Sequence, residues 1–135
     1  MSRAQRRTPQ APPNPTVLIV EDDVTFAEGL HQVLGGSFDV DVVNDGEAAR
    51  RRFEAGETFD LVLSDLQMPR MNGLELLRWV LTEVPSLARS FVFLTGAVGT
   101  VLLDDLQQLH RGPVLAKPFT HRELVDALHQ VLRRP

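Results

Sequence analysis

The sequence predicts an α/β fold: a doubly wound, five-stranded parallel sheet of order 2-1-3-4-5 with helices on both faces. Five short apolar runs alternate along the chain with five amphipathic segments of helical period. Four of the runs do not alternate with polar residues, which is typical of strands covered on both faces. The run Phe38–Val43 (FDVDVV) does alternate, as expected of an edge strand. With right-handed crossovers, an edge position for this second strand favours the order 2-1-3-4-5.

Each element follows from its local pattern. The first helix is expected at 24–34, because Phe26, Leu30 and Leu34 share one face and two glycines follow. Asp23, Asp45 and Thr120 precede helical segments and are predicted N-caps, since their side-chain oxygens can accept from free backbone N–H groups. The expected strands are Val17–Val20, Phe38–Val43, Leu61–Ser64, Phe91–Leu94 and Val114–Ala116. The expected helices are 24–34, 46–55, 73–83, about 100–110 and 120–133.

Composition favours one ordinary domain. The chain has 135 residues, of which 43% are hydrophobic and 24% charged. Residues 1–16 contain four prolines and little to bury, so they are predicted to be a disordered leader before a domain at 17–135. From residue 17 onward, 11 basic residues face 18 acidic ones, a net charge of −7 that disfavours nucleic acid and anionic lipid. No apolar stretch approaches a membrane span, and the absence of cysteine fits a cytoplasmic location.

Chemically distinctive side chains follow the predicted strands. In an open α/β sheet the ligand crevice lies at the carboxyl ends of the strands. Acids there provide the hard oxygen ligands that Mg²⁺ accepts, and an aspartate can be a nucleophile toward phosphorus. A lysine and a hydroxyl would then stabilise the phosphoryl oxygens. The residues in these positions are Glu21, Asp22 and Asp23 after the first strand, Asp65 after the third, Thr95 after the fourth, and Lys117, the only lysine, after the fifth.

These positions resemble the receiver domains of bacterial two-component signalling, over about Thr16 to Arg133. The family places an acidic pair after its first strand, and here Glu21-Asp22 stand there. Its hydroxyl residue is matched by Thr95. Its D-x-x-M-P-x-M-x-G loop is matched by Asp65, Met68, Pro69, Met71 and Gly73, and its K-P-F motif by Lys117, Pro118 and Phe119.

The resemblance implies roles. Asp65 would accept a phosphoryl group from a phosphohistidine on a sensor histidine kinase or a histidine phosphotransfer protein. Asp22 would bind Mg²⁺ directly, Glu21 through water, and Gln67 through its backbone carbonyl. Lys117 would pair with Asp65 and then with the phosphate, and its bond to Pro118 would be cis. Thr95 would swing toward the phosphate. This movement would shift an equilibrium between two arrangements of the face formed by the fourth and fifth strands.

One position departs from the family pattern. The residue three before the lysine is usually aromatic and couples the hydroxyl to output, whereas here it is Val114. The segment around it is more like receivers attached to hybrid sensor kinases. We expect a protein that signals through contact with a downstream protein, as a monomer or weak dimer. Beyond autocatalytic phosphotransfer and slow self-dephosphorylation, we expect no enzymatic activity.

Alternative interpretations stay open at this point. Haloacid dehalogenase phosphatases also use an aspartyl nucleophile, but they need a second aspartate two residues later, where this chain has Gln67. A pseudo-receiver that no longer takes phosphate is disfavoured by the complete acid, hydroxyl and lysine set, although Val114 keeps it possible. Because the chain stops soon after its last predicted helix, it is either a stand-alone regulator or a receiver fragment of a hybrid histidine kinase. We expect Arg50, Arg51 and Arg52 to form a solvated helix face, Phe26 and Trp79 to pack in the core, and the four histidines to lie at the surface.

Overall fold

Five parallel strands form one sheet in the order β2-β1-β3-β4-β5 in the computed structural model, which describes residues 13–133. This is the fold and the strand order that the sequence predicts. The predicted leader lies outside the described residues except for its last four positions, and the first strand already begins at Thr16. The strands are β1 (Thr16–Val20), β2 (Asp39–Val43), β3 (Leu61–Asp65), β4 (Phe91–Thr95) and β5 (Val114–Ala116).

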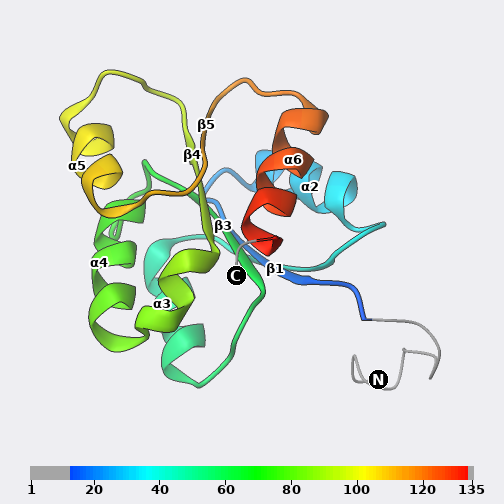
Figure 1. The fold of residues 1–135 in the computed structure, drawn as a ribbon, viewed down its shortest axis with the longest axis horizontal. Helices are drawn as coiled ribbons and strands as arrows, with labels where there is room; N and C mark the ends of the chain where they lie inside the picture. The colour runs from blue at the N-terminus through cyan, green and yellow to red at the C-terminus, as the bar shows by residue number, and fades with distance from the viewer. Residues whose placement is uncertain (1–12, 134–135) are drawn as a thin grey trace.

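Helices cover both faces of the sheet (Figure 1). Helices α2 and α6 lie on one face, and α3, α4 and α5 lie on the other. Their positions match the predicted segments to within one residue at each end. The α-helices are α2 (Val24–Leu34), α3 (Gly46–Glu54), α4 (Gly73–Glu83), α5 (Val101–Leu109) and α6 (His121–Leu132), and a 3₁₀ helix, η1, spans Pro85–Ser90.

The central strands are fully buried, and the two outer strands are not. Every residue of β3 and β4 is buried, as is all of β1 beyond its first residue. The edge strand β2 has no buried residue, in agreement with its predicted edge position, but its half-buried and exposed residues do not alternate one by one as its sequence pattern does. The other edge strand, β5, is only half-buried, although its apolar run predicted burial on both faces. A short run of apolar residues therefore does not distinguish a central strand from an edge strand covered on one side.

The predicted caps are present at the helix N-termini. The side chains of Asp23, Asp45 and Thr120 each accept a hydrogen bond from a backbone N–H in the first turn of their helix. Asn72 caps α4 in the same way, and its backbone N–H donates to the Glu75 carboxylate three residues later. This capping box fixes where α4 begins, directly after the loop that follows β3.

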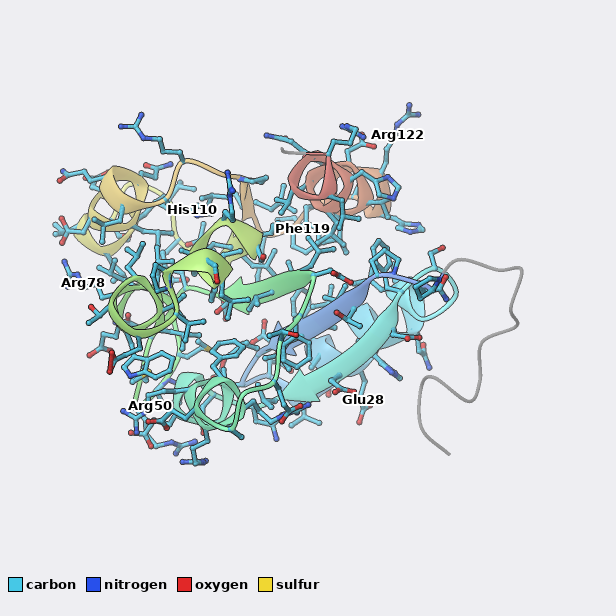
Figure 2. The ribbon with its side chains drawn as sticks, turned by 60° about the horizontal axis from the view of Figure 1, so that its bottom comes forward. Glu28, Arg50, Arg78, His110, Phe119 and Arg122 are labelled. Carbon is cyan, nitrogen blue, oxygen red and sulfur yellow. The ribbon has the colours of Figure 1, made fainter. Side chains whose placement is uncertain are left out.

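Of the three arginines predicted to form a solvated helix face, Arg51 is exposed, whereas Arg50 and Arg52 are half-buried. Glu28, Arg78 and Arg122 are exposed on α2, α4 and α6 and point outward (Figure 2). Arg52 was predicted to lie on a solvated face, but its guanidinium donates to Asp41 at 2.7 Å and to Glu57 at 2.6 Å. It therefore links β2 to the segment after α3. Among residues 13–133, no helix is long and apolar enough to cross a membrane.

Candidate functional site

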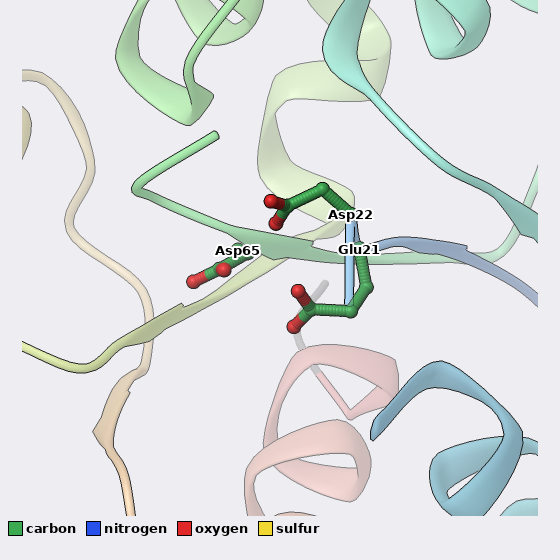
Figure 3. Close-up of side chains that lie close together, drawn as sticks. All are labelled: Glu21, Asp22 and Asp65. Atoms are coloured by element: carbon green, nitrogen blue, oxygen red, sulfur yellow. The ribbon is translucent and has the colours of Figure 1, made fainter. Parts of the chain in front are cut away.

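Three carboxylates meet at the carboxyl ends of β1 and β3 (Figure 3). Glu21 and Asp22 follow β1, and Asp65 is the last residue of β3. The two strands are paired in parallel, so both end at the same edge of the sheet. One carboxylate oxygen from each residue lies within 4.8 Å of the others. Glu21 and Asp65 are buried, with relative exposures of 1% and 5%, whereas Asp22 is exposed.

Lys117 joins this cluster from the end of β5. Its ammonium Nζ donates to Glu21 Oε1 at 3.0 Å and to Asp65 Oδ2 at 3.3 Å. Its backbone N–H donates to the Thr95 carbonyl at 2.7 Å, which continues the pairing of β5 with β4. The Lys117–Pro118 peptide bond is cis, as the resemblance implied. The structure therefore brings together the acids of two strands and the lysine of a third.

Burial dominates the electrostatics of the two inner carboxyls. It raises the pKa of Glu21 to about 7, because the hydrogen bonds from Asp23 N–H and Lys117 only partly offset the lost solvation. Burial also raises the pKa of Asp65, against the opposing charge of Lys117. For Lys117 itself, burial lowers the pKa, but the hydrogen bond to Glu21 and the charge of Asp65 outweigh it and raise the pKa. One ammonium group thus lies among three carboxyl groups, and burial makes two of them, Glu21 and Asp65, easier to protonate than they would be in water.

The donor set fits a hard divalent cation. Carboxylate oxygens are the ligands that Mg²⁺ takes from proteins, usually one or two of them with waters filling the other positions. Oxygens bound about 2.1 Å from Mg²⁺ in an octahedron lie about 3 to 4 Å apart, so small side-chain movements would bring the present cluster to that spacing. Glu21, Asp22 and Asp65 are therefore the residues that could hold the ion. The metal role of the Gln67 backbone carbonyl stays a prediction.

The loop after β3 is held against its surroundings at two points. Gly73 lies so close to β3 that a Cβ atom there would come within 2.7 Å of the Asp65 carbonyl oxygen. Arg70 has a positive φ of 65° and forms an ion pair with the buried Asp45 at 2.5 Å. A side chain at position 73 would therefore displace the backbone of the residue that presents its carboxylate to the site. The motif predicted the glycine, but nothing in it indicated the Arg70–Asp45 contact.

Thr95 lies at the end of β4, but its hydroxyl is held by other groups than Asp65. The Gln67 amide Nε2 donates to Thr95 Oγ1 at 3.0 Å, and Oγ1 donates to the Ala97 carbonyl at 3.0 Å. Gly96 N–H also reaches Gln67 Oε1 at 3.4 Å. The Gln67 side chain thus connects the loop after β3 to the end of β4. The motif indicated a metal role for the Gln67 backbone carbonyl, and nothing in the sequence indicated this side-chain contact.

Val114 occupies the position where the family usually has an aromatic residue. It is half-buried, it is the β5 partner of Phe93 in β4, and it packs against the same core cluster. The Phe93 ring is perpendicular to the imidazole of His110, with 4.8 Å between centroids. His110 was predicted to lie at the surface, but it is buried, and its Nε2 lies 3.1 Å from the Pro113 carbonyl. The strand partner of Val114 is therefore an aromatic residue of β4, whose ring contacts the imidazole that follows α5.

Comparison with known proteins gives a consistent result. The sequence model of the response regulator receiver domain family matches residues 17–129. The response regulator receiver protein CpdR of Brucella abortus is 32% identical over 117 residues, which cover 86% of this chain and 95% of that protein. The transcriptional regulatory protein CpxR homolog of Haemophilus influenzae is 34% identical over 121 residues, covering 87% of this chain. The chain spans only 50% of that second relative's length.

Solved structures share the fold. The receiver domain of the sensor histidine kinase PA1611 from Pseudomonas aeruginosa, determined with a magnesium ion coordinated in its active site cleft, superposes with a TM-score of 0.80. The match covers 90% of this chain and 99% of that one at 24% sequence identity. At that identity the likeness supports the architecture, which agrees with the observed strand order.

Proposed function

This chain belongs to the response regulator receiver domain family, and on that premise we propose that Asp65 accepts a phosphoryl group from a partner phosphohistidine, with Mg²⁺ bound beside it. The observation that carries the proposal is the contact of Lys117 with both Glu21 and Asp65 in one buried cluster. An aspartate that only accepted hydrogen bonds from nearby backbone N–H groups would need neither Lys117 nor the acids Glu21 and Asp22. The magnesium ion in the related kinase receiver supports the choice of cation.

The proposed step is a displacement at phosphorus. A carboxylate oxygen of Asp65 forms the new O–P bond while the N–P bond to the donor imidazole breaks and the imidazole keeps the electron pair. Lys117 holds the nucleophile in its charged form against the effect of burial and then lies beside the phosphoryl oxygens. Glu21, Asp22 and Asp65 would hold Mg²⁺, which would supply positive charge to offset the charge of the phosphoryl group. Thr95 would offer its hydroxyl after leaving Gln67.

The chain is proposed to act as a phosphoacceptor without turnover on a separate substrate. A phosphatase with an aspartyl nucleophile needs a general acid that protonates the leaving group and activates water. The residue two positions after Asp65 is Gln67, whose amide cannot do so, and its side chain is hydrogen-bonded to Thr95. We therefore expect autocatalytic phosphorylation followed by slow hydrolysis of the acyl phosphate.

Receiver domains act with histidine kinases and downstream effectors, and the same classes of partner are proposed here. The proposed donor is a sensor histidine kinase or a histidine phosphotransfer protein. The output is proposed to be contact with another protein in the cytoplasm, because the net charge of −7 from residue 17 onward disfavours nucleic acid. Both a stand-alone regulator and the receiver of a hybrid histidine kinase are compatible with this proposal.

The test is phosphorylation by a small-molecule donor. Acetyl phosphate with Mg²⁺ should convert the protein to an acid-stable, base-labile acyl phosphate, detected as a mass gain of one phosphoryl group. Asp65→Asn should abolish the gain, and chelation of Mg²⁺ should do the same. Asp126→Asn, on the exposed face of α6, is the matched control and should react like the wild type.

The outcome also decides between the receiver and the pseudo-receiver. If the wild type takes no phosphoryl group from acetyl phosphate and no beryllofluoride in the presence of Mg²⁺, the phosphoacceptor proposal is wrong. The chain would then be a phosphorylation-independent interaction module with the same fold. A phosphoryl group found equally in Asp65→Asn would also contradict the proposal, because the acceptor would be another residue.

A further inference from the structure

The ammonium group of Lys117 has a third neighbour besides the two carboxylates. Its Nζ lies 4.3 Å from the centroid of the Phe26 ring. This distance is within the range at which the negative face of an aromatic ring attracts a cation. Phe26 comes from the first turn of α2, close behind the acidic residues that follow β1. The sequence predicts only a packing role for Phe26, because helical periodicity identifies a buried face but not the groups that contact it.

The Phe26 ring is itself fixed by its surroundings. It lies nearly perpendicular to the Phe119 ring, at 77° and 6.1 Å between centroids. Both rings pack against the core cluster between the sheet and helices α2 and α6. The backbone N–H of Phe26 donates to the capping carboxylate of Asp23 at 3.1 Å, which holds the first turn of the helix. The ring therefore presents a defined surface to the ammonium group.

The Phe26 ring, unlike the two carboxylates that contact Lys117, is not a candidate ligand of a divalent cation. Glu21 and Asp65 are the residues that could hold a divalent cation, so their oxygens would be shared between that cation and Lys117. The ring has no such competing role. A lysine side chain has four flexible carbon–carbon torsions, so it needs a contact that limits where its ammonium lies. Phe26 provides that contact whether or not the carboxylates are engaged elsewhere.

We propose that Phe26 is a positioning residue that holds the Lys117 ammonium beside Asp65 for phosphoryl transfer. It acts through Lys117 and touches none of the reacting atoms. The inference rests on the proposed phosphoacceptor function and deepens it. It predicts that an aromatic ring at position 26, rather than hydrophobic bulk alone, sets how fast Asp65 is phosphorylated.

The contact can be measured in the free protein. Because Lys117 is the only lysine in the sequence, selective lysine labelling gives one side-chain NMR signal. The ring current of Phe26 should shift the Cε protons of Lys117 upfield. Phe26→Leu should abolish this shift, and Phe26→Tyr should keep it. If the shift is the same in Phe26→Leu as in the wild type, the ring does not hold the lysine and the proposal is wrong.

The functional arm compares initial rates of phosphorylation by acetyl phosphate and Mg²⁺. Phe26→Leu should slow the reaction by about three- to tenfold, and Phe26→Tyr should restore most of the rate. Phe53→Leu is the matched control, because it removes a ring from an edge-to-face pair with Phe59 on the other face of the sheet. Its rate should stay near that of the wild type. Urea unfolding of each variant verifies that the folded state is populated.

A double-mutant cycle separates positioning from general packing. In a Lys117→Gln background, Phe26→Leu should cause no further loss of rate, because the group that the ring positions is gone. An equal loss in both backgrounds would overturn the proposal and assign Phe26 a purely structural role. If the wild type itself is not phosphorylated, the proposed function fails, a result distinct from a wild type that reacts at the same rate as Phe26→Leu.

Discussion

Two clusters in this protein each place one cationic side chain between two carboxylates. Carboxyl pKa values shift in opposite directions in the two clusters. In the surface cluster, Arg52 binds Asp41 at 2.7 Å and Glu57 at 2.6 Å. In the site cluster, Lys117 binds Glu21 at 3.0 Å and Asp65 at 3.3 Å. The two surface carboxylate side chains are 57% and 43% exposed, whereas those of the site are 1% and 7% exposed.

This difference in exposure reverses the direction of the pKa shifts. The hydrogen bond from Arg52 lowers the pKa of Glu57, because water still solvates the carboxylate and the ion pair only adds to its stability. At the site, burial raises the pKa of Glu21 and Asp65 despite the nearby lysine. In the surface cluster, Arg52 donates hydrogen bonds to both carboxylates and so links β2 to the segment after α3. The site cluster has two carboxyl groups with raised pKa values, which is a property expected of a binding site.

The largest expected effect is the loss of Lys117. Lys117→Gln leaves two buried carboxylates without their cation, so the free energy of unfolding should fall by about 3 kcal/mol at pH 8. At pH 5 the loss should be less than half as large, because Glu21, with a pKa of about 7, is then protonated in the folded state. Urea unfolding at the two pH values measures this. Equal losses of unfolding free energy at pH 8 and pH 5 would mean that the charges of the buried carboxylates do not cause the destabilisation.

The second prediction concerns the pH dependence of the wild type. The folded-state pKa of Glu21 is about 7 and its ordinary value is 4.5, so the folded protein binds the proton more tightly than the unfolded chain. This group therefore favours folding at low pH, and about 3 kcal/mol should be lost as pH rises from 4.5 through 7. The measured quantity is the difference in unfolding free energy between the wild type and Glu21→Gln across this range.

The stability contributed by Glu57 should change with pH in the opposite direction to that of Glu21. The folded-state pKa of Glu57 is lowered, so the stability that it contributes is present above its ordinary pKa of 4.5 and is lost as pH falls through the folded value. Glu57→Gln should accordingly show a difference from the wild type that is constant above about pH 5 and shrinks only in acid. If the difference in unfolding free energy from the wild type changed with pH in the same direction for Glu21→Gln and Glu57→Gln, the contrast between the clusters would be wrong.

The third prediction concerns cation binding. Asp22 is exposed, so Asp22→Asn should leave the fold intact, yet it removes one of three clustered carboxylates and should weaken Mg²⁺ binding by about tenfold or more. Isothermal titration calorimetry measures the affinity. Asp41→Asn, in the surface cluster, is the control and should bind Mg²⁺ like the wild type. An unchanged affinity in Asp22→Asn would place the cation elsewhere.

The smallest effect is expected at the surface cluster itself. Arg52→Gln should lower the free energy of unfolding by about 1 kcal/mol or less, and by less still at high salt, because exposed ion pairs are weak and screened. Phosphorylation by acetyl phosphate should proceed at the wild-type rate. A loss as large as that of Lys117→Gln would show that exposure does not separate the two clusters.

Most of the fold could be predicted because it depends on local patterns. Uninterrupted apolar runs identified the central strands, and the alternation in Phe38–Val43 identified the edge strand β2. The half-buried state of β5 fits its edge position in the predicted strand order, although its apolar run alone indicated burial on both faces. The 3₁₀ helix after Pro85 was missed. It begins at the proline that marks the end of α4, and six residues of 3₁₀ geometry give no strong periodic signal.

The candidate site was predictable in its residues but not in its side-chain contacts. The ends of parallel strands converge by topology, so Glu21, Asp65 and Lys117 could be placed together from sequence order alone. The contacts of Phe26 with Lys117 and of Gln67 with Thr95 depend on rotamers and on how helices sit on the sheet. His110 was placed at the surface because an isolated histidine carries no periodic signal, yet it packs beneath Phe93.

The most direct test of the central claim is to locate the phosphoryl group on the wild-type protein. After reaction with acetyl phosphate and Mg²⁺, borohydride reduces an aspartyl phosphate to homoserine, and peptide mass spectrometry identifies the converted residue. We expect conversion at Asp65 alone among the aspartates, with Asp22 and Asp41 unchanged. Conversion at another aspartate, or none in a protein that has gained a phosphoryl group, would contradict the central claim.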